Sequence, residues 1–126
     1  MATAGTFRTS IDLPADRRKK LIALLDQQLA DTFDLYGQAK QAHWNVKGPS
    51  FIALHELFDK VYDGLAEYVD LLAERIVQLG GRADGIAASV VERSSLPPYP
   101  SNATDGMDHI RGLSAGLAAF GKVARK

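Results

Sequence analysis

The sequence predicts an all-α fold, a bundle of long antiparallel helices, on three observations. Apolar residues recur every three or four positions along two long stretches, residues 14–46 and 50–79. A short break, Gly48-Pro49, separates the two stretches. No stretch alternates apolar and polar residues as a half-buried strand does. With 126 residues, 46% of them hydrophobic, the chain has the size of one domain with a packed core.

The first helix is predicted over residues 14–46, after a tail at residues 1–13, so the domain spans 14–126. Pro14 suits the first turn of a helix, with Asp12 or Leu13 before it. The apolar positions at helical spacing are Leu21, Leu25, Leu29, Phe33 and Tyr36.

The second helix is predicted over residues 50–79, and Gly80-Gly81 supplies its stop and its left-handed cap. Its apolar stripe consists of Leu54, Phe58, Val61, Leu65, Tyr68, Leu72, Ile76 and Leu79. At 1.5 Å per residue each of the two helices spans ~45 Å, and their short connection makes them antiparallel neighbours.

Residues 86–93 are predicted to form a short helix, and residues 96–100, Leu-Pro-Pro-Tyr-Pro, an extended segment. Asn102 or Thr104 is predicted to cap a further long helix, with Ile110, Leu113, Leu117 and Phe120 on one face. The chain ends at Lys126 without a helix stop signal, so three long helices are visible.

Composition favours a soluble cytoplasmic protein and indicates no particular partner. The formal net charge is zero. The absence of cysteine excludes disulfides and thiolate zinc sites. No signal peptide is recognised, and no apolar run approaches the ~20 residues that span a bilayer, so no membrane partner is expected.

Two pairs of metal-binding residue types lie on one face of the second predicted helix. His55 and Asp59 form the first pair, and Asp70 and Glu74 the second, each spaced i,i+4. At 100° per residue all four fall within ~100° of one another, away from the apolar stripe. Because Asp59 and Asp70 are ~16 Å apart along the helix axis, one chain cannot bring both pairs to one ion.

A two-fold dimer removes this mismatch. If the helix crosses its own copy antiparallel so that residue i meets residue 129 − i, His55 faces Glu74 of the copy and Asp59 faces Asp70 of the copy. Folding the hairpin at Pro49 brings His43 level with His55. The predicted ligand shell is therefore His43, His55 and Asp59 from one chain with Asp70 and Glu74 from the other.

Mixed imidazole and carboxylate ligands suit iron(II), manganese or zinc, and carboxylates placed to bridge at an interface favour redox-active iron. Against this stands the simpler interpretation that each i,i+4 pair is an ordinary helix-surface interaction. Trp44 is most simply a packing residue, and in a redox site it would also absorb stray oxidising equivalents. His109 is predicted at the surface or at an interface.

The motifs around these residues resemble the Dps family, the mini-ferritins that protect DNA in starved cells. The resemblance is carried by the run from His43 to Phe51, by Leu54-His55-Glu56 and Phe58-Asp59, by Asp70 and Ala73-Glu74-Arg75-Ile76, and by Tyr99-Pro100 before the last helix. It covers nearly the whole chain. It implies a ferritin-like four-helix bundle whose fourth long helix is absent from this sequence.

The resemblance also implies a function. Subunits of this family usually form a dodecameric shell with di-iron ferroxidase sites at two-fold interfaces, and His43, His55, Asp59, Asp70 and Glu74 match its ligand positions. The implied reaction is oxidation of iron(II), preferably by hydrogen peroxide, with ferric iron stored inside the shell. Because the fourth helix normally completes the bundle and its pores, assembly of the shell is left open.

Two other functions are weighed. The first is a non-enzymatic nucleoid protein, since some family members bind DNA through basic tails. Here the tail holds only Arg8, and the cluster Arg17, Arg18, Lys19 and Lys20 sits at a helix start, so a solvated helix end is the preferred interpretation. The second is a structural helical fragment without activity, in view of the missing helix.

Overall fold

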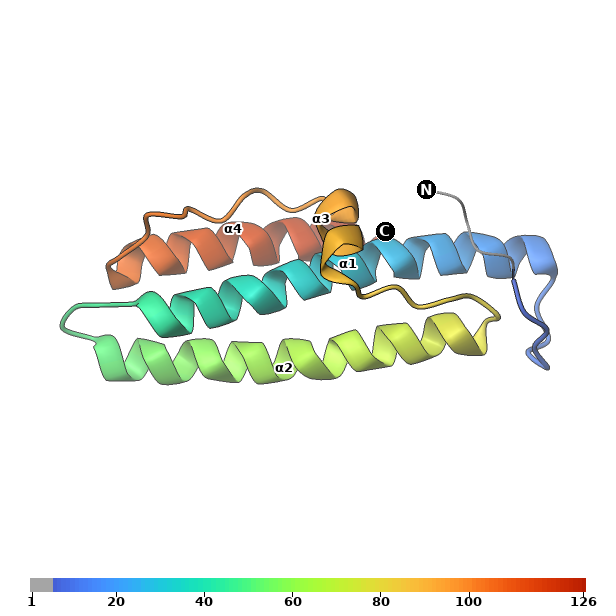
Figure 1. Ribbon diagram of the computed structural model, residues 1–126, viewed down its shortest axis with the longest axis horizontal. Helices are drawn as coiled ribbons and strands as arrows, with labels where there is room; N and C mark the ends of the chain where they lie inside the picture. Colours follow the sequence, from blue (N-terminus) through green and yellow to red (C-terminus); the bar gives the residue numbers. More distant parts are fainter. Residues whose placement is uncertain (1–5) are drawn as a thin grey trace.

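Three long helices and one short helix make up the fold, which is all-α as predicted. The computed structural model describes residues 6–126, with α1 at Ala15–Asn45, α2 at Phe51–Gln78, α3 at Ala87–Arg93 and α4 at Gly106–Ala124. Helices α1 and α2 form a long antiparallel hairpin, and α4 lies along the other side of α1 (Figure 1). The short α3 packs against α1, so α1 contacts all three other helices. Residues 1–5 of the predicted tail lie outside the described residues.

The ends of the hairpin helices fall within one residue of their predicted positions. Pro14 is the residue that caps the start of α1, where its missing N–H and fixed φ cost nothing. Gly48 in the turn has a φ of +123°, and Gly80 after α2 has a φ of +92°. Both angles lie in the left-handed region, where a side chain is disfavoured, so the two glycines fix where the helices turn.

The cap of α4 differs from the prediction. Asp105, and not Asn102 or Thr104, caps this helix, and its Oδ1 accepts a hydrogen bond of 2.8 Å from the backbone N–H of Asp108. A carboxylate at this place satisfies a free N–H group and faces the positive end of the helix dipole. The same loop meets the α1–α2 turn, where the Lys47 N–H donates to the Thr104 carbonyl at 2.9 Å.

The main core lies where α1, α2 and α4 meet. Its buried residues are Leu35, Ala39, Ala42, Val46, Phe58, Leu65 and Leu113. On α1 the core face therefore uses alanines that apolar spacing alone did not select, because small side chains let the helices approach closely. Three positions of the predicted apolar faces are wrong, because Tyr68 is 58% exposed and Leu21 and Leu117 are each 39% exposed.

His109 is buried, which corrects its predicted place at the surface. Only 1% of the residue is exposed, and its Nδ1 is 2.5 Å from the Tyr99 hydroxyl. The extended segment before α4 places Tyr99 over the helix, and Phe58 of α2 closes the other side at 6.2 Å between ring centres. Burial, and then the charge of Asp108, raises the pKa of Tyr99 to about 12.

A buried polar cluster joins α1 to the segment after α3. Asp31 is fully buried and accepts hydrogen bonds from the Ser95 N–H at 2.8 Å, the Ser95 hydroxyl at 2.7 Å and Gln27 at 3.1 Å. Arg93 pairs with Asp26 at 2.7 Å. These partners satisfy the buried carboxylate, so the connection from α2 to α4 is fixed across the middle of α1.

The described part of the predicted tail, residues 6–13, is not helical and lies against the end of α2. The Phe7 N–H donates to the Gly80 carbonyl at 2.7 Å, and the Thr9 hydroxyl donates to the Gln78 carbonyl at 2.7 Å. None of the helices within residues 6–126 has the length and apolar character needed to cross a membrane.

Candidate metal centre

The α1–α2 hairpin places His43 and His55 face to face. Their rings are stacked, with centres 3.7 Å apart and planes inclined by 20°. The hairpin argument from the sequence predicted that the two histidines lie at one level, and this geometry confirms it. Phe51, one turn before His55, packs its ring 5.0 Å from the His55 ring.

Each histidine is held by the backbone of the other. His43 Nδ1 lies 2.7 Å from the His55 carbonyl oxygen, and His55 Nδ1 lies 2.7 Å from the His43 carbonyl oxygen. A carbonyl can only accept, so both Nδ1 atoms carry the hydrogen. In the neutral rings the lone pairs are then on both Nε2 atoms, which is the arrangement that an outer hydrogen bond imposes on a metal-binding histidine.

Asp59 lies beside the histidines and is paired with a lysine that the sequence analysis did not select. Lys40 Nζ is 2.8 Å from Asp59 Oδ1 and 4.4 Å from the centre of the Tyr62 ring. The hydrogen bond from Lys40 is the main cause of a lowered pKa of Asp59; burial opposes it, and the charge of Lys40 lowers the pKa further. Asp59 is therefore an ionised acceptor in this structure.

These groups line one shallow pocket on the outer side of the hairpin. Its lining residues are His43, His55, Glu56, Asp59, Lys60 and Asp63. Three of the five predicted ligands, His43, His55 and Asp59, therefore line the same pocket. Glu56 and Asp63 add two further carboxylates to the same pocket.

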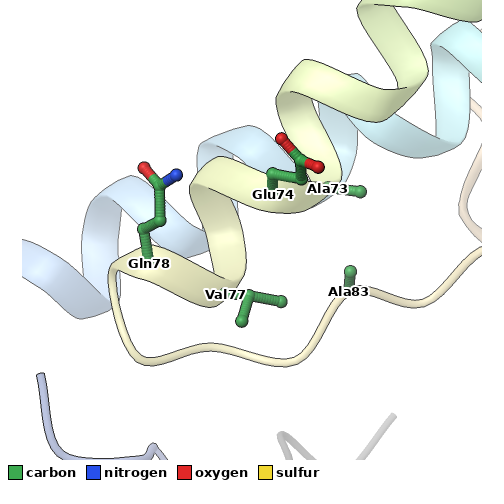
Figure 2. A pocket seen from close by; sticks show the side chains of 5 residues that line it. All are labelled: Ala73, Glu74, Val77, Gln78 and Ala83. Carbon is green, nitrogen blue, oxygen red and sulfur yellow. The ribbon is translucent and has the colours of Figure 1, made fainter.

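The other two predicted ligands lie farther along α2. Asp70 and Glu74 are both exposed. Figure 2 shows Glu74 projecting from α2 beside a second pocket, lined by Ala73, Glu74, Val77, Gln78 and Ala83. Within residues 6–126, no three His, Asp or Glu side chains of one chain converge as a metal site.

The remaining predicted residues are spread over the surface. Trp44 is 64% exposed, so it is not a packing residue of the isolated chain, and its neighbour His43 alone turns toward α2. Among the basic residues, Arg18 is engaged in structure: its guanidinium donates to the Leu13 carbonyl at 3.2 Å and the Leu79 carbonyl at 3.0 Å. The others, Arg8, Arg17, Lys19 and Lys20, are exposed.

Comparison with known proteins places the chain in a family. A sequence model of the ferritin-like domain matches residues 22–117. The chain is 41% identical, over 119 residues, to the DNA protection during starvation protein of Agrobacterium fabrum, and the alignment covers 94% of this chain and 72% of that protein. This chain belongs to the Dps family.

Solved Dps structures share the fold. DpsA14 from Streptomyces coelicolor superposes with a TM-score of 0.91 at 31% identity, over 98% of this chain and 74% of that one. The Dps protein of Vibrio cholerae, described as a member of a broad superfamily of ferritin-like diiron-carboxylate proteins, gives a TM-score of 0.87 at 27% identity, over 98% of this chain and 77% of that one. The Dps fold expected from the sequence is confirmed, and this Dps chain spans about three quarters of the length of these relatives.

Proposed function

We propose that this Dps chain oxidises iron(II), with hydrogen peroxide as the preferred oxidant, and stores the ferric product, so that the cell and its DNA are protected. Its relatives include a DNA protection during starvation protein and a protein of the diiron-carboxylate superfamily. The ligands proposed are His43, His55 and Asp59 of one chain with Asp70 and Glu74 of a second copy. Iron is the substrate that these groups bind.

The observation that carries this proposal is the reciprocal hydrogen bonding of the two histidines. Two backbone carbonyls fix both Nδ1 atoms as donors, which leaves both Nε2 lone pairs free beside the Asp59 carboxylate. Imidazole nitrogen and carboxylate oxygen together suit iron(II).

The second half of the site follows from the register of α2 against its own copy. Ile52 and Val77, which meet across the proposed axis, are 62% and 57% exposed in the single chain. Exposed apolar residues flanking both ligand pairs favour burial against another α2 helix. A two-fold interface uses one patch twice, so it generates two equivalent sites.

In this arrangement each residue has a simple chemical task. The imidazoles bind through neutral Nε2 and the carboxylates through ionised oxygen, so protons are released when a metal binds at acidic pH. Two iron(II) ions bound as a pair would supply two electrons to one peroxide, which takes up two protons and becomes two waters, so that no hydroxyl radical is released. Lys40 must give up Asp59 Oδ1 when this oxygen binds iron.

Loss of one ligand from each half tests the chemistry. Iron(II) oxidation by peroxide is measured in the unmodified protein and in the His43→Ala, Glu74→Ala double variant, with Glu67→Ala, an exposed carboxylate of α2, as control. We expect the double variant to lose the reaction and the control to keep it. Equal rates in all three proteins would contradict the proposal.

Mixing two inactive variants tests whether the site is shared. A variant lacking His55 and Asp59 and a variant lacking Asp70 and Glu74 are each expected to be inactive. In a mixed dimer one site loses all four ligands and the other keeps all of them. Random reassociation should therefore restore about a quarter of the activity, because half of the dimers are mixed and half of their sites are intact. No recovery on reassociation into mixed dimers would show that the halves do not meet.

Larger assembly, location and DNA binding belong to this proposal as separate expectations. A dodecameric shell would be seen as a native mass twelve times that of the chain. The alternative function, a non-enzymatic nucleoid protein in the cytoplasm, rests on the exposed Arg17, Lys19 and Lys20 at the start of α1. A gel-shift series across salt concentration tests it, and absence of binding at low ionic strength would exclude it.

A further inference from the structure

A tyrosine pair adjoins the proposed site. Tyr36 of α1 and Tyr62 of α2 are stacked, with ring centres 4.2 Å apart and planes inclined by 26°, and their hydroxyls are hydrogen-bonded to each other. Phe33 holds Tyr36 from the side, with ring centres 6.2 Å apart and planes inclined by 84°. Both tyrosines are half-buried against the core. The pair therefore has a single defined geometry across the α1–α2 hairpin.

This geometry aligns the reactive carbons of the two rings. Because the rings are stacked with their hydroxyls together, the ring carbons next to each hydroxyl also face one another. These are the carbons at which a tyrosyl radical carries much of its unpaired electron. Two such radicals in this arrangement are neighbours and could couple through a carbon–carbon bond once the rings turn toward each other.

The pair is also close to the proposed metal ligands. Lys40 Nζ is 4.4 Å from the centre of the Tyr62 ring and 2.8 Å from Asp59 Oδ1. The Tyr62 ring centre is thus at most about 7.2 Å from that carboxylate oxygen, the sum of these two distances. Direct electron transfer from the ring to a metal ion bound by Asp59 is feasible over such a separation.

We propose that Tyr36 and Tyr62 form a modification site, which is oxidised to an intramolecular dityrosine when peroxide is reduced at a site holding only one iron(II). The inference rests on the proposed function. A single iron(II) supplies one of the two electrons that peroxide needs, and the tyrosine pair supplies the other. The pair then prevents release of a hydroxyl radical, at the cost of its own oxidation.

The reaction balances. For each tyrosine oxidised, one peroxide, one iron(II) and one proton are consumed. One iron(III), one tyrosyl radical and two waters form, as the peroxide O–O bond breaks. The phenol gives up one electron and its hydroxyl proton. When two radicals couple, one carbon–carbon bond forms, and the hydrogen on each coupled carbon moves to the phenol oxygen, so two phenols are restored.

Peptide analysis tests this inference separately from iron oxidation. The protein receives one iron(II) per chain without oxygen, then peroxide, over several cycles, and a sample without iron is treated alike. We expect blue dityrosine fluorescence and a proteolytic product that joins the Tyr36 and Tyr62 peptides with the loss of two hydrogens. The chain should still migrate as a monomer on a denaturing gel.

Matched variants locate the bond. Tyr36→Phe and Tyr62→Phe should each lose the joined peptide while iron(II) is still oxidised, and Tyr68→Phe, which alters an exposed tyrosine of α2, should keep it. Iron oxidation without the joined peptide in the unmodified protein would overturn this inference and leave the proposed function standing. Absence of iron oxidation would overturn both.

Discussion

Lys40 provides a direct test of how the proposed metal pocket is held before a metal binds. Its ammonium group is 2.8 Å from Asp59 Oδ1, so it occupies an oxygen that the proposed ligand set requires. Lys40→Met removes the charge and keeps an unbranched side chain to cover the Tyr62 ring. The variant should bind a redox-inert divalent ion such as cobalt(II) more tightly near pH 7, because no ion pair has to be broken.

The expected gain in cobalt(II) affinity is small, and its size can be estimated from the exposure of the two side chains. The Lys40 and Asp59 side chains are 26% and 41% exposed, so water screens their attraction. Ion pairs exposed to this degree change an equilibrium by a factor of about 1.5 to 5. We therefore expect a two- to fivefold increase in affinity, and a larger factor would mean that the pair is better shielded in the assembled protein.

The variant should also change how Asp59 titrates. Lys40 is the largest cause of the lowered pKa of this carboxyl group, so the pKa should rise toward its ordinary value in Lys40→Met. A carboxyl group with a lowered pKa stabilises the fold above its unfolded-state pKa, and this contribution disappears as the pH falls through the folded-state pKa. The variant should be slightly less stable than the unmodified protein at neutral pH and equal to it in strong acid.

Calorimetric titration of the protein with cobalt(II) at pH 7 measures the affinity, and carbon NMR of the Asp59 carboxyl measures the titration. Lys60→Met is the matched control, because Lys60 lines the same pocket but forms no described ion pair. If both variants bind cobalt(II) equally well, the effect is one of general charge. Unchanged affinity and an unchanged Asp59 pKa in Lys40→Met would refute the reasoning.

Three further substitutions test the scaffold by chemical denaturation. Ile76→Ala empties a fully buried position and should lower the free energy of unfolding by ~2–5 kcal/mol. Gly80→Ala should cost more than the ~1–2 kcal/mol of a left-handed residue, since φ is +92° and the new Cβ would lie 2.5 Å from the Phe7 carbonyl oxygen. Tyr99→Phe leaves buried His109 Nδ1 unpaired, at ~1–3 kcal/mol. The raised Tyr99 pKa also means that the unmodified protein should lose stability between pH 10 and about 12, a loss that Tyr99→Phe should reduce.

The helix pattern could be predicted because local signals and tertiary packing agree in it. Pro14, Gly48 and Gly80 each restrict or free one backbone angle, and each lies at a helix end within a residue of the prediction. The predictions for α4 were weaker because its environment is set by residues distant in sequence. Neither the burial of His109 nor its bond to Tyr99 can be inferred from helical spacing, since the extended segment that covers it has no periodic pattern.

The candidate site, too, could be predicted from the sequence only in part. His43 and His55 could be paired from the sequence because the turn at Pro49 lies midway between them and hairpin geometry fixes which positions are level. The hydrogen bonds that set their tautomers depend on backbone carbonyls, which leave no trace in residue identity. Lys40 was missed because a lysine on a helix is usually solvated, and only the close approach of α1 and α2 gives it a carboxylate partner.

The placement of both halves of the proposed site on α2 links metal binding to dimer geometry. His55 and Asp59 lie near one end of the helix and Asp70 and Glu74 near the other, so a shift of one copy along its partner separates both sets of ligands at once. A shift by one residue moves contacts by ~1.5 Å and turns the facing side chains by ~100°, which no side-chain rotation can restore at a metal–oxygen distance of ~2 Å. The apolar residues beside the ligands, with Ile52 meeting Val77 across the axis, would therefore set the register that the chemistry needs. In this proposal the contacts that hold the dimer and the contacts that bind iron are specified by the same face of one helix.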